Sequence, residues 1–263
     1  MGASAVNRGG GFVHYTVEGS IARVTMDSPH NRNALSAALV EQLHRRFADA
    51  AADASVRTVV LDHAGGTFCA GADLTEASVA DPTAAAVDRA RELAALLRAI
   101  LELPVPVIAA VDGHVRAGGL GLIGACDIVV AGPDSTFALT EARIGVAPSI
   151  ISLTLLPKMT PRSAGRYFLT GERFGAAQAA QIGLATVATD DVAGTVAALA
   201  ADIAKGSPQG LAASKALTTA PILDGFDRSA DTLTTQSARL FVSEEAREGM
   251  VAFLEKRPPR WQS

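Results

Sequence analysis

The sequence contains few of the residues that would tie it to a disulfide framework, a metal or a membrane. It has two cysteines among 263 residues, Cys69 and Cys126, and they form neither a CxxC pair nor a Cys/His metal spacing. No stretch approaches the roughly 18 consecutive apolar residues that a membrane-spanning helix needs. We therefore predict no disulfide framework, no metal, no redox cofactor and no membrane partner.

The sequence also lacks a surplus of positive charge. It has 23 basic and 27 acidic residues, a net charge of −4, and no segment that concentrates Lys and Arg, which argues against a nucleic-acid partner. The first residues have no apolar run long enough for a signal peptide, and Val6 stands where a myristoylation motif has Ser or Thr. We expect a cytoplasmic protein.

Apolar residues are abundant, and their spacing favours a layered α/β fold. They make up 49% of the chain, which at this length suits one large domain with a sizeable core. Strands alternate with helices up to about residue 190, and only helical patterns follow. We predict a flexible leader (1–11), an α/β core (12–192) and a helical region (193–263). The expected strands are 12–16, 21–26, 57–62, 105–111, 127–131 and 135–139, and the expected helices are 36–53, 87–101, 192–205, 208–219, 226–242 and 244–255.

The segment FCAGAD, Phe68 to Asp73, follows a predicted strand and consists mainly of small residues. Small residues let a ligand approach the backbone closely, and they leave N–H groups free to point at an anion. An ordinary tight turn has the same composition. The segment is therefore a candidate binding loop, with the tight turn as the alternative.

The segment AGGLG, Ala117 to Gly121, opens a helix-compatible run. Consecutive glycines at a helix N-terminus expose backbone donors, with the positive end of the helix dipole behind them. The glycines also satisfy GxGxxG, and Glu141 follows about 20 residues on, as in a dinucleotide-binding fingerprint. We reject that interpretation because four residues separate the motif from its strand and the helix has only about two turns.

The segment TEARIGVAP contains Glu141 between a short strand and a Gly/Pro turn. A glutamate in apolar surroundings is a candidate general acid or base, because burial raises its pKa toward neutral pH. A surface glutamate paired with Arg143 would give the same pattern.

Taken in order, these segments resemble the enoyl-CoA hydratase/isomerase (crotonase) superfamily. The resemblance rests on FCAGADL, PVIAAVDG, the glycine-rich helix start, ACDI, FALTEARIG and LTGERFGAAQAAQIGLAT, and it extends from about residue 12 to the EKRPPRW ending. It implies a crotonase-like spiral of ββα repeats and a C-terminal helical trimerisation region. It also implies a homotrimer or hexamer that acts on an acyl-CoA thioester in fatty-acid metabolism.

The resemblance implies roles for particular residues. The backbone N–H groups of Ala72 and Gly118 would form an oxyanion hole that polarises the thioester carbonyl and holds an enolate, and Glu141 would move protons. Coenzyme A would enter as part of the substrate, with no separate cofactor. Residues expected along the substrate are Ala70, Gly71, Asp73 and Gly119, and His30 to Arg32 and Leu74 are expected along the coenzyme A channel beside Ala70.

The sequence departs from the family pattern at one catalytic position. Family hydratases have two glutamates, and Gly121 stands where the first would be, with no carboxylate between Asp112 and Asp127. In lacking the first glutamate, the sequence resembles bacterial single-glutamate members of the family that are similar to methylglutaconyl-CoA hydratases. Ser149-Ile150-Ile151 stands where many relatives have glycines, which indicates a differently shaped pocket wall.

Four activities stay open at this point. The first is hydration of a 2-enoyl-CoA, a lyase reaction with Glu141 as acid and base, and double-bond isomerisation is second. Decarboxylation of a malonyl-type acyl-CoA and non-catalytic acyl-CoA binding are the others. Arg116 stands where an apolar residue is common, and it could pair with a carboxylate on the acyl group or face a subunit contact.

Overall fold

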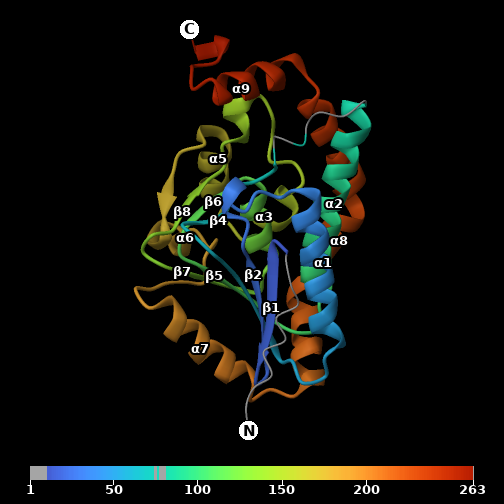
Figure 1. Cartoon of the computed structure of the whole chain (residues 1–263), viewed down its shortest axis with the longest axis vertical. Helices are drawn as coiled ribbons and strands as arrows, with labels where there is room; N and C mark the ends of the chain where they lie inside the picture. The colour runs from blue at the N-terminus through green and yellow to red at the C-terminus, as the bar shows by residue number, and fades with distance from the viewer. Residues whose placement is uncertain (1–10, 74–75, 77–80, 263) are drawn as a thin grey trace.

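The computed structural model describes residues 11–73, 76 and 81–262, so the predicted leader up to residue 10 and the predicted site residue Leu74 lie outside the described residues. The strands form two sheets (Figure 1). The large sheet has the order β1-β2-β3-β5-β7-β10, with β1 (Val13–Glu18), β2 (Ile21–Met26), β3 (Thr58–His63), β5 (Val107–Val111), β7 (Ile128–Ala131) and β10 (Val187–Ala188). The small sheet has the order β4-β6-β8-β9, with β4 (Thr67–Cys69), β6 (His114–Arg116), β8 (Thr136–Ala138) and β9 (Phe174–Gly175).

The chain alternates between the two sheets. It passes from β3 to β4, from β5 to β6 and from β7 to β8, and each step adds one parallel neighbour to both sheets. This repetition is the spiral of ββα units that the sequence predicts. The hairpin of β1 and β2 pairs antiparallel at the start, as expected, but the three-residue strands β4 and β6 were missed.

Helices cover the large sheet on both faces. The helices are α1 (Ala37–Ala52), α2 (Pro82–Glu102), α3 (Gly118–Ala125), α4 (Ser152–Leu155), α5 (Pro161–Thr170), α6 (Ala176–Gln181), α7 (Val192–Ile203), α8 (Pro208–Phe241) and α9 (Glu244–Leu254). Side chains of β3 alternate between two cores, because successive strand residues point to opposite faces. Val59 and Leu61 join the main core, whereas Val60 packs with Val196 of α7. Figure 1 shows α1, α2 and α8 running along one side and α7 lying apart from them.

Two helices differ from the sequence prediction. Helix α2 begins at Pro82, five residues early, because the Asp81 carboxylate accepts hydrogen bonds from the N–H groups of Thr83 and Ala84. The predicted helices 208–219 and 226–242 are one helix, α8, with Pro221 inside it. A proline removes one helical hydrogen bond, and the long packing of α8 against α2 offsets that loss.

A buried ion pair fastens α8 to the sheet layer. The Lys215 side chain is 3% exposed, and its Nζ lies 2.8 Å from Oδ2 of Asp127. The same ammonium donates to the carbonyl oxygens of Ile100 and Val105, at 2.8 and 3.1 Å. Lys215 therefore joins α8 to the end of α2 and to the starts of β5 and β7.

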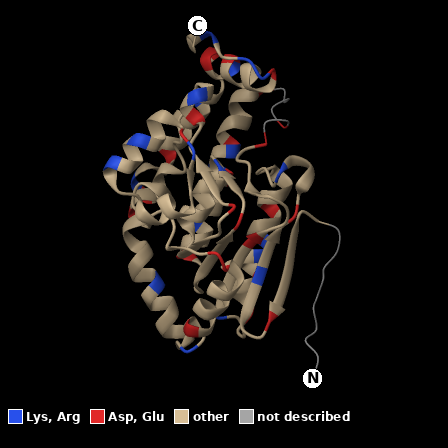
Figure 2. Ribbon diagram, turned by 90° about the vertical axis from the view of Figure 1, so that its left-hand side faces the viewer, with Lys and Arg blue, Asp and Glu red and all other residues tan. Residues whose placement is uncertain are grey.

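Charges elsewhere are interspersed along the chain. Figure 2 shows bands of Lys and Arg scattered among bands of Asp and Glu. Within the described residues, no helix is both long enough and apolar enough to cross a membrane.

Candidate active site

Three neighbouring strands of the small sheet deliver the predicted catalytic residues to one place. Strands β4, β6 and β8 are parallel neighbours, and Ala72, Gly118 and Glu141 each follow the end of one of them within three residues. Carboxyl ends of parallel strands share one edge of a sheet, which is where α/β folds place ligands. All three residues line a single cavity of about 120 Å³.

The loop after β4 touches the start of α3. A Cβ atom placed on Gly71 would lie 2.8 Å from Cβ of Ala117 and 3.6 Å from the nitrogen of Gly118. Gly71 also has a φ of +94°, which favours glycine. A side chain at Gly71 would therefore push apart the two segments that bring Ala72 and Gly118 together.

The N–H groups of Ala72 and Gly118 are available to a ligand. Gly118 is the first residue of α3, so its N–H has no acceptor within the helix. Ala72 pairs with Leu35 in an isolated bridge, but that bridge uses the carbonyl of Gly71, which accepts from the Leu35 N–H at 2.7 Å. Within the described residues, neither N–H group has a hydrogen-bond acceptor.

The backbone just before Gly118 is strained. Ala117 has φ 47° and ψ −119°, a conformation that residues with a Cβ rarely adopt. Such residues cost about 1–3 kcal/mol and cluster at functional sites. The strain coincides with the single residue that joins β6 to α3, next to Gly118 in the cavity lining.

Asn33 holds the segment that carries Leu35, and sequence reasoning missed it. It is 1% exposed, and its side chain accepts from the Ser28 N–H at 2.6 Å and donates to the carbonyls of Ala64 and Thr67 at 3.2 and 2.8 Å. Asparagine has no characteristic spacing in such a loop, so the sequence offered no signal for this role.

Glu141 is buried and its carboxylate is largely unsatisfied. The residue is 7% exposed, and its Oε2 has no hydrogen-bond partner in the described part of the chain. Burial raises the pKa of Glu141 to about 7, because desolvation penalises the charged form. The alternative ion pair with Arg143 is absent from the described contacts; Arg143 Nε donates to the carbonyl of Thr170 at 2.9 Å. A carboxyl group with this pKa can both accept and release a proton at neutral pH.

A short 3-10 helix, Glu141–Ile144, orients this side chain, and α9 packs directly behind it. A Cβ atom on Gly145 would lie 2.6 Å from the backbone of Glu245. A Cβ atom on Gly249 would lie 2.5 Å from the backbone carbon of Ile144. Both contacts are backbone to backbone, so α9 fixes the turn that carries Glu141.

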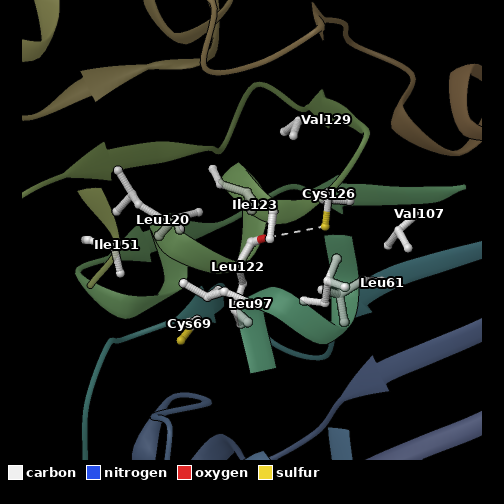
Figure 3. Packing of buried hydrophobic residues seen from close by; sticks show 14 of the residues in the cluster. Leu61, Cys69, Leu97, Val107, Leu120, Leu122, Ile123, Cys126, Val129 and Ile151 are labelled. Carbon is white, nitrogen blue, oxygen red and sulfur yellow. Dashed lines mark hydrogen bonds between the residues drawn. The ribbon is translucent and has the colours of Figure 1, made fainter. Parts of the chain in front are cut away.

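The position of the missing carboxylate is filled. A Cβ atom on Gly121 would lie 2.5 Å from Cγ2 of Ile151 and 3.3 Å from Cδ1 of Leu97. Figure 3 shows Ile151 and Leu97 among the buried side chains around α3. The sequence predicted a differently shaped pocket wall at residues 149–151. In the structure, Ile151 occupies the space into which a side chain at residue 121 would project.

The remaining predicted residues have other surroundings. The Ala70 N–H donates to the carbonyl of Arg32 at 3.2 Å, and Asp73 accepts from Nδ2 of Asn31 at 2.9 Å. Gly119 packs against Cys69, since a Cβ atom there would lie 2.7 Å from Cβ of Cys69. These residues build the loops around the cavity, and the described cavity lining does not include them.

Arg116 is tied into the small sheet. Its NH1 group donates to the carbonyls of Val115 and Thr136 at 2.8 and 2.6 Å, and its NH2 group donates to Oγ1 of Thr136 at 2.9 Å. It is not among the described residues that line the cavity. The geometry favours a role in pairing β6 with β8 over contact with an acyl group.

The glycine spacing of α3 serves packing. One reason for rejecting a dinucleotide site was wrong, because β6 ends only two residues before α3. The other reason holds, since α3 has only eight residues. Gly119, Gly121 and Gly124 lie against Cys69, Ile151 and Thr154, where each glycine allows a close approach.

Two helices supply further walls of the cavity, and of these the sequence analysis did not anticipate α8. Helix α2 contributes Ala86, Arg89, Ala90, Glu92 and Leu93, and helix α8 contributes Ser237 and Phe241. The residues from α8 are distant from those of α2 in the sequence, and the packing of α2 on α8 brings the two sets together at the site.

Comparison with known proteins gives a consistent result. A family model described as enoyl-CoA hydratase/isomerase matches residues 16–263. Carnitinyl-CoA dehydratase of Proteus mirabilis is 32% identical over 257 residues, which cover 95% of this chain and 97% of that protein. The crystal structure of an enoyl-CoA hydratase from Mycobacterium avium is 62% identical with a TM-score of 0.90, covering 95% of this chain and 98% of that one. That of carnitinyl-CoA hydratase from Mycobacterium avium is 28% identical with a TM-score of 0.83, covering 97% and 99%.

Proposed function

Because the chain belongs to the enoyl-CoA hydratase/isomerase family, we propose that it hydrates a 2-enoyl-CoA thioester with Glu141 as the one carboxylate that moves protons. One observation carries the proposal. The buried, unpartnered Oε2 of Glu141 shares a cavity with the free backbone N–H groups of Ala72 and Gly118. A cavity with two convergent donors and one carboxyl of raised pKa suits chemistry on a carbonyl compound.

The two N–H groups would receive the thioester oxygen. When water adds to C3 of the enoyl group, negative charge moves onto that oxygen and an enolate forms. Fixed donors at Ala72 and Gly118 stabilise the developing charge, and each such donor typically contributes about 3–4 kcal/mol. Because both donors are backbone groups, the surrounding side chains need only be small enough to let the thioester approach.

Glu141 would handle both proton transfers. Its carboxylate takes a proton from the water whose oxygen bonds to C3, and the resulting carboxylic acid gives that proton to C2 as the enolate collapses. The carboxyl group thus ends the cycle as it began. The pKa of about 7 suits both halves, since neither protonation state is strongly favoured at neutral pH.

Double-bond isomerisation is the second candidate, and Ile151 is the observation that favours it. An isomerase moves one proton between two carbons, which needs one carboxylate and no bound water. Ile151 fills the space beside Gly121 with an apolar side chain and leaves no room there for a second carboxylate. The same oxyanion donors would hold the dienolate that forms during the transfer.

A panel of thioesters separates these activities. The purified protein is incubated with 2-enoyl-CoAs of different chain length and branching, and loss of the conjugated enoyl absorbance reports hydration. A parallel set of 3-enoyl-CoAs reports isomerisation through the appearance of that absorbance. Release of carbon dioxide from malonyl-type thioesters reports decarboxylation. If no thioester is converted but coenzyme A esters bind, the protein is a binder and the proposal is wrong.

The matched variants are Glu141→Gln and Glu18→Gln. Glu141→Gln keeps the shape of the side chain but removes the proton acceptor, so turnover should fall about 10³-fold while binding of a saturated acyl-CoA is retained. Glu18 lies exposed at the end of β1, and its replacement should leave turnover unchanged. Equal turnover in the Glu141→Gln variant and the native protein would remove Glu141 from the mechanism.

A further inference from the structure

Helix α2 presents an arginine to the cavity that Ala72, Gly118 and Glu141 also line. Residues 86, 89, 90 and 93 recur at helical spacing and line the cavity, so Arg89 lies on the face of α2 that forms its wall. Leu97, two turns later on α2, reaches the position beside Gly121. Arg89 therefore lies about 12 Å further along the helix axis, away from the space that Ile151 fills.

Among the described residues, the charge of Arg89 is unpaired. It is half-buried, and within the described residues its guanidinium forms no hydrogen bond or ion pair. By contrast Arg98, on the same helix, pairs with Glu102 and Asp227. Glu92 lies three residues after Arg89 and also lines the cavity, but it is exposed and forms no ion pair with Arg89 in the described structure. A half-buried, unpaired guanidinium loses hydration without gaining a partner, so a bound anion would restore its hydrogen bonds.

A second polar group of the cavity lining can also donate a hydrogen bond. Ser237 of α8 lines the same cavity and is 8% exposed. Apart from Glu92, the other described side chains that α2 and α8 contribute are apolar: Ala86, Ala90, Leu93 and Phe241. The wall thus offers a planar cation and a hydroxyl within a mostly apolar surface, which suits a carboxylate or a phosphate.

We propose that Arg89, with Ser237 in the same cavity wall, binds an anionic oxygen group of the acyl-CoA ligand. Two parts of such a ligand carry this chemistry: a carboxylate at the far end of the acyl chain, or a phosphate of the coenzyme A portion. The proposal rests on the proposed function only in taking an acyl-CoA as the ligand, and it holds whichever reaction the site performs. A carboxylate source would make the protein selective for dicarboxylic acyl groups.

The experiment measures binding of saturated thioesters by calorimetry, so that no turnover is required. Glutaryl-CoA and pentanoyl-CoA have acyl chains of equal length and differ in the terminal carboxylate. Pentanoyl-pantetheine lacks the phosphates of coenzyme A. Each is titrated into the native protein, into Arg89→Met and into Arg91→Met. Arg91 lies exposed on the same helix and is absent from the described cavity lining, so it controls for loss of one positive charge.

The two sources give different patterns. If Arg89 binds an acyl carboxylate, Arg89→Met should weaken binding of glutaryl-CoA about tenfold or more and change pentanoyl-CoA by less than twofold. If it binds a phosphate, both coenzyme A thioesters should weaken alike, and pentanoyl-pantetheine should be unaffected. In either case Arg89→Lys should recover part of the loss, because the charge remains while the two-pronged geometry is lost.

Two results would overturn the proposal. One is binding of all three ligands within twofold of the native protein in Arg89→Met. The other is equal weakening of all three, including pentanoyl-pantetheine, which would show a change in cavity shape rather than loss of an anion contact. Thermal unfolding of each variant checks that the fold is intact. Since no reaction is monitored, failure of the hydratase assay leaves this test unaffected.

Discussion

The large and small sheets are built by the same alternation of the chain, yet they do different work. The large sheet is covered on both faces, and its central strands β3 and β5 are almost wholly buried. None of its strand residues is among the described residues that line the cavity. The small sheet consists of strands of two or three residues, and Ala72, Gly118 and Glu141 all follow its strand ends. The large sheet contributes strands that are buried on both faces, whereas the small sheet brings three adjacent strand ends to the cavity.

The buried pair of Lys215 gives the sharpest test on the side of the large sheet. Lys215→Met removes the ammonium and, within the described residues, leaves the Asp127 carboxylate with the Val107 N–H as its one partner. Breaking a buried ion pair in this way costs about 3–5 kcal/mol. We expect that loss in the free energy of unfolding measured with urea, with turnover per folded molecule within twofold of the native value.

Lys205→Met is the control for Lys215. Lys205 is exposed and pairs with Asp202 on the surface, so its replacement should change the free energy of unfolding by less than about 1 kcal/mol. Loss of activity without loss of stability in Lys215→Met would contradict the assignment of a stabilising role to the large sheet and of the site to the small sheet.

The buried carboxyl group of Glu141, which follows the small sheet, should lower the free energy of unfolding, and this effect should depend on pH. Glu141 keeps its proton up to about pH 7 in the folded state but only to about 4.5 when unfolded. The unfolded chain therefore ionises first as pH rises, and the stability of the fold decreases between about pH 4.5 and 7. At 1.36 kcal/mol per pKa unit, the shift of about 2.5 units gives a cost of up to about 3 kcal/mol above pH 7.

Glu141→Gln removes that pH-dependent cost. The difference in unfolding free energy between Glu141→Gln and the native protein should shift in favour of the variant by up to about 3 kcal/mol between pH 4.5 and pH 8. Urea unfolding at both pH values measures it. A difference that stays constant with pH would mean that Glu141 is not desolvated in the folded state.

The space beside Gly121 tests how closely the site is packed. Gly121→Glu should destabilise the fold, because its Cβ would meet Ile151 at 2.5 Å. Ile151→Gly alone leaves a cavity and also destabilises. The double variant should be more stable than the sum of the two losses predicts, by about 1–3 kcal/mol. Additive losses in a double-mutant cycle would show that Ile151 does not occupy this space.

Arg116 gives the smallest expected effect. Arg116→Met removes the hydrogen bonds to Thr136 that join β6 to β8, at a cost of about 1–2 kcal/mol in unfolding free energy. Kinetic constants for acyl-CoAs with and without a terminal carboxylate should change by the same factor. A selective loss on the carboxylated substrates would restore Arg116 as a substrate-binding residue and would make this side of the small sheet part of the specificity.

The sequence predicts the large sheet better than the small one, for a physical reason. Strands buried on both faces read as apolar runs, and RTVVLD and VPVIAAV predicted β3 and β5 to within two residues. The three-residue strands β4 and β6 lie beside glycine-rich segments and are too short to show a period, whereas β8, of the same length, was predicted at 135–139. In the sequence, β4 and β6 could be recognised only by their position just before the glycine-rich motifs.

The site was predictable where backbone chemistry leaves a composition signal. Small residues mark the loops of Ala72 and Gly118, and the resemblance to a family placed Glu141 with them. The resemblance pointed to Ser149-Ile150-Ile151 as a changed pocket wall, but it could not predict that Ile151 fills the space beside Gly121. The place of Arg89 in the cavity lining could not be predicted either, because it depends on how α2 packs on α8.

The packing of α9 behind Glu141 has a consequence for the time at which the site is completed. Gly249, which abuts Ile144, is 108 residues later in the chain than Glu141. At about 5–20 residues per second, a ribosome takes roughly 5 to 20 seconds to cover that interval. The loops of Ala72 and Gly118 are synthesised well before then. During synthesis the loops of Ala72 and Gly118 can therefore be in place while the turn that carries Glu141 still lacks the packing of α9 behind it.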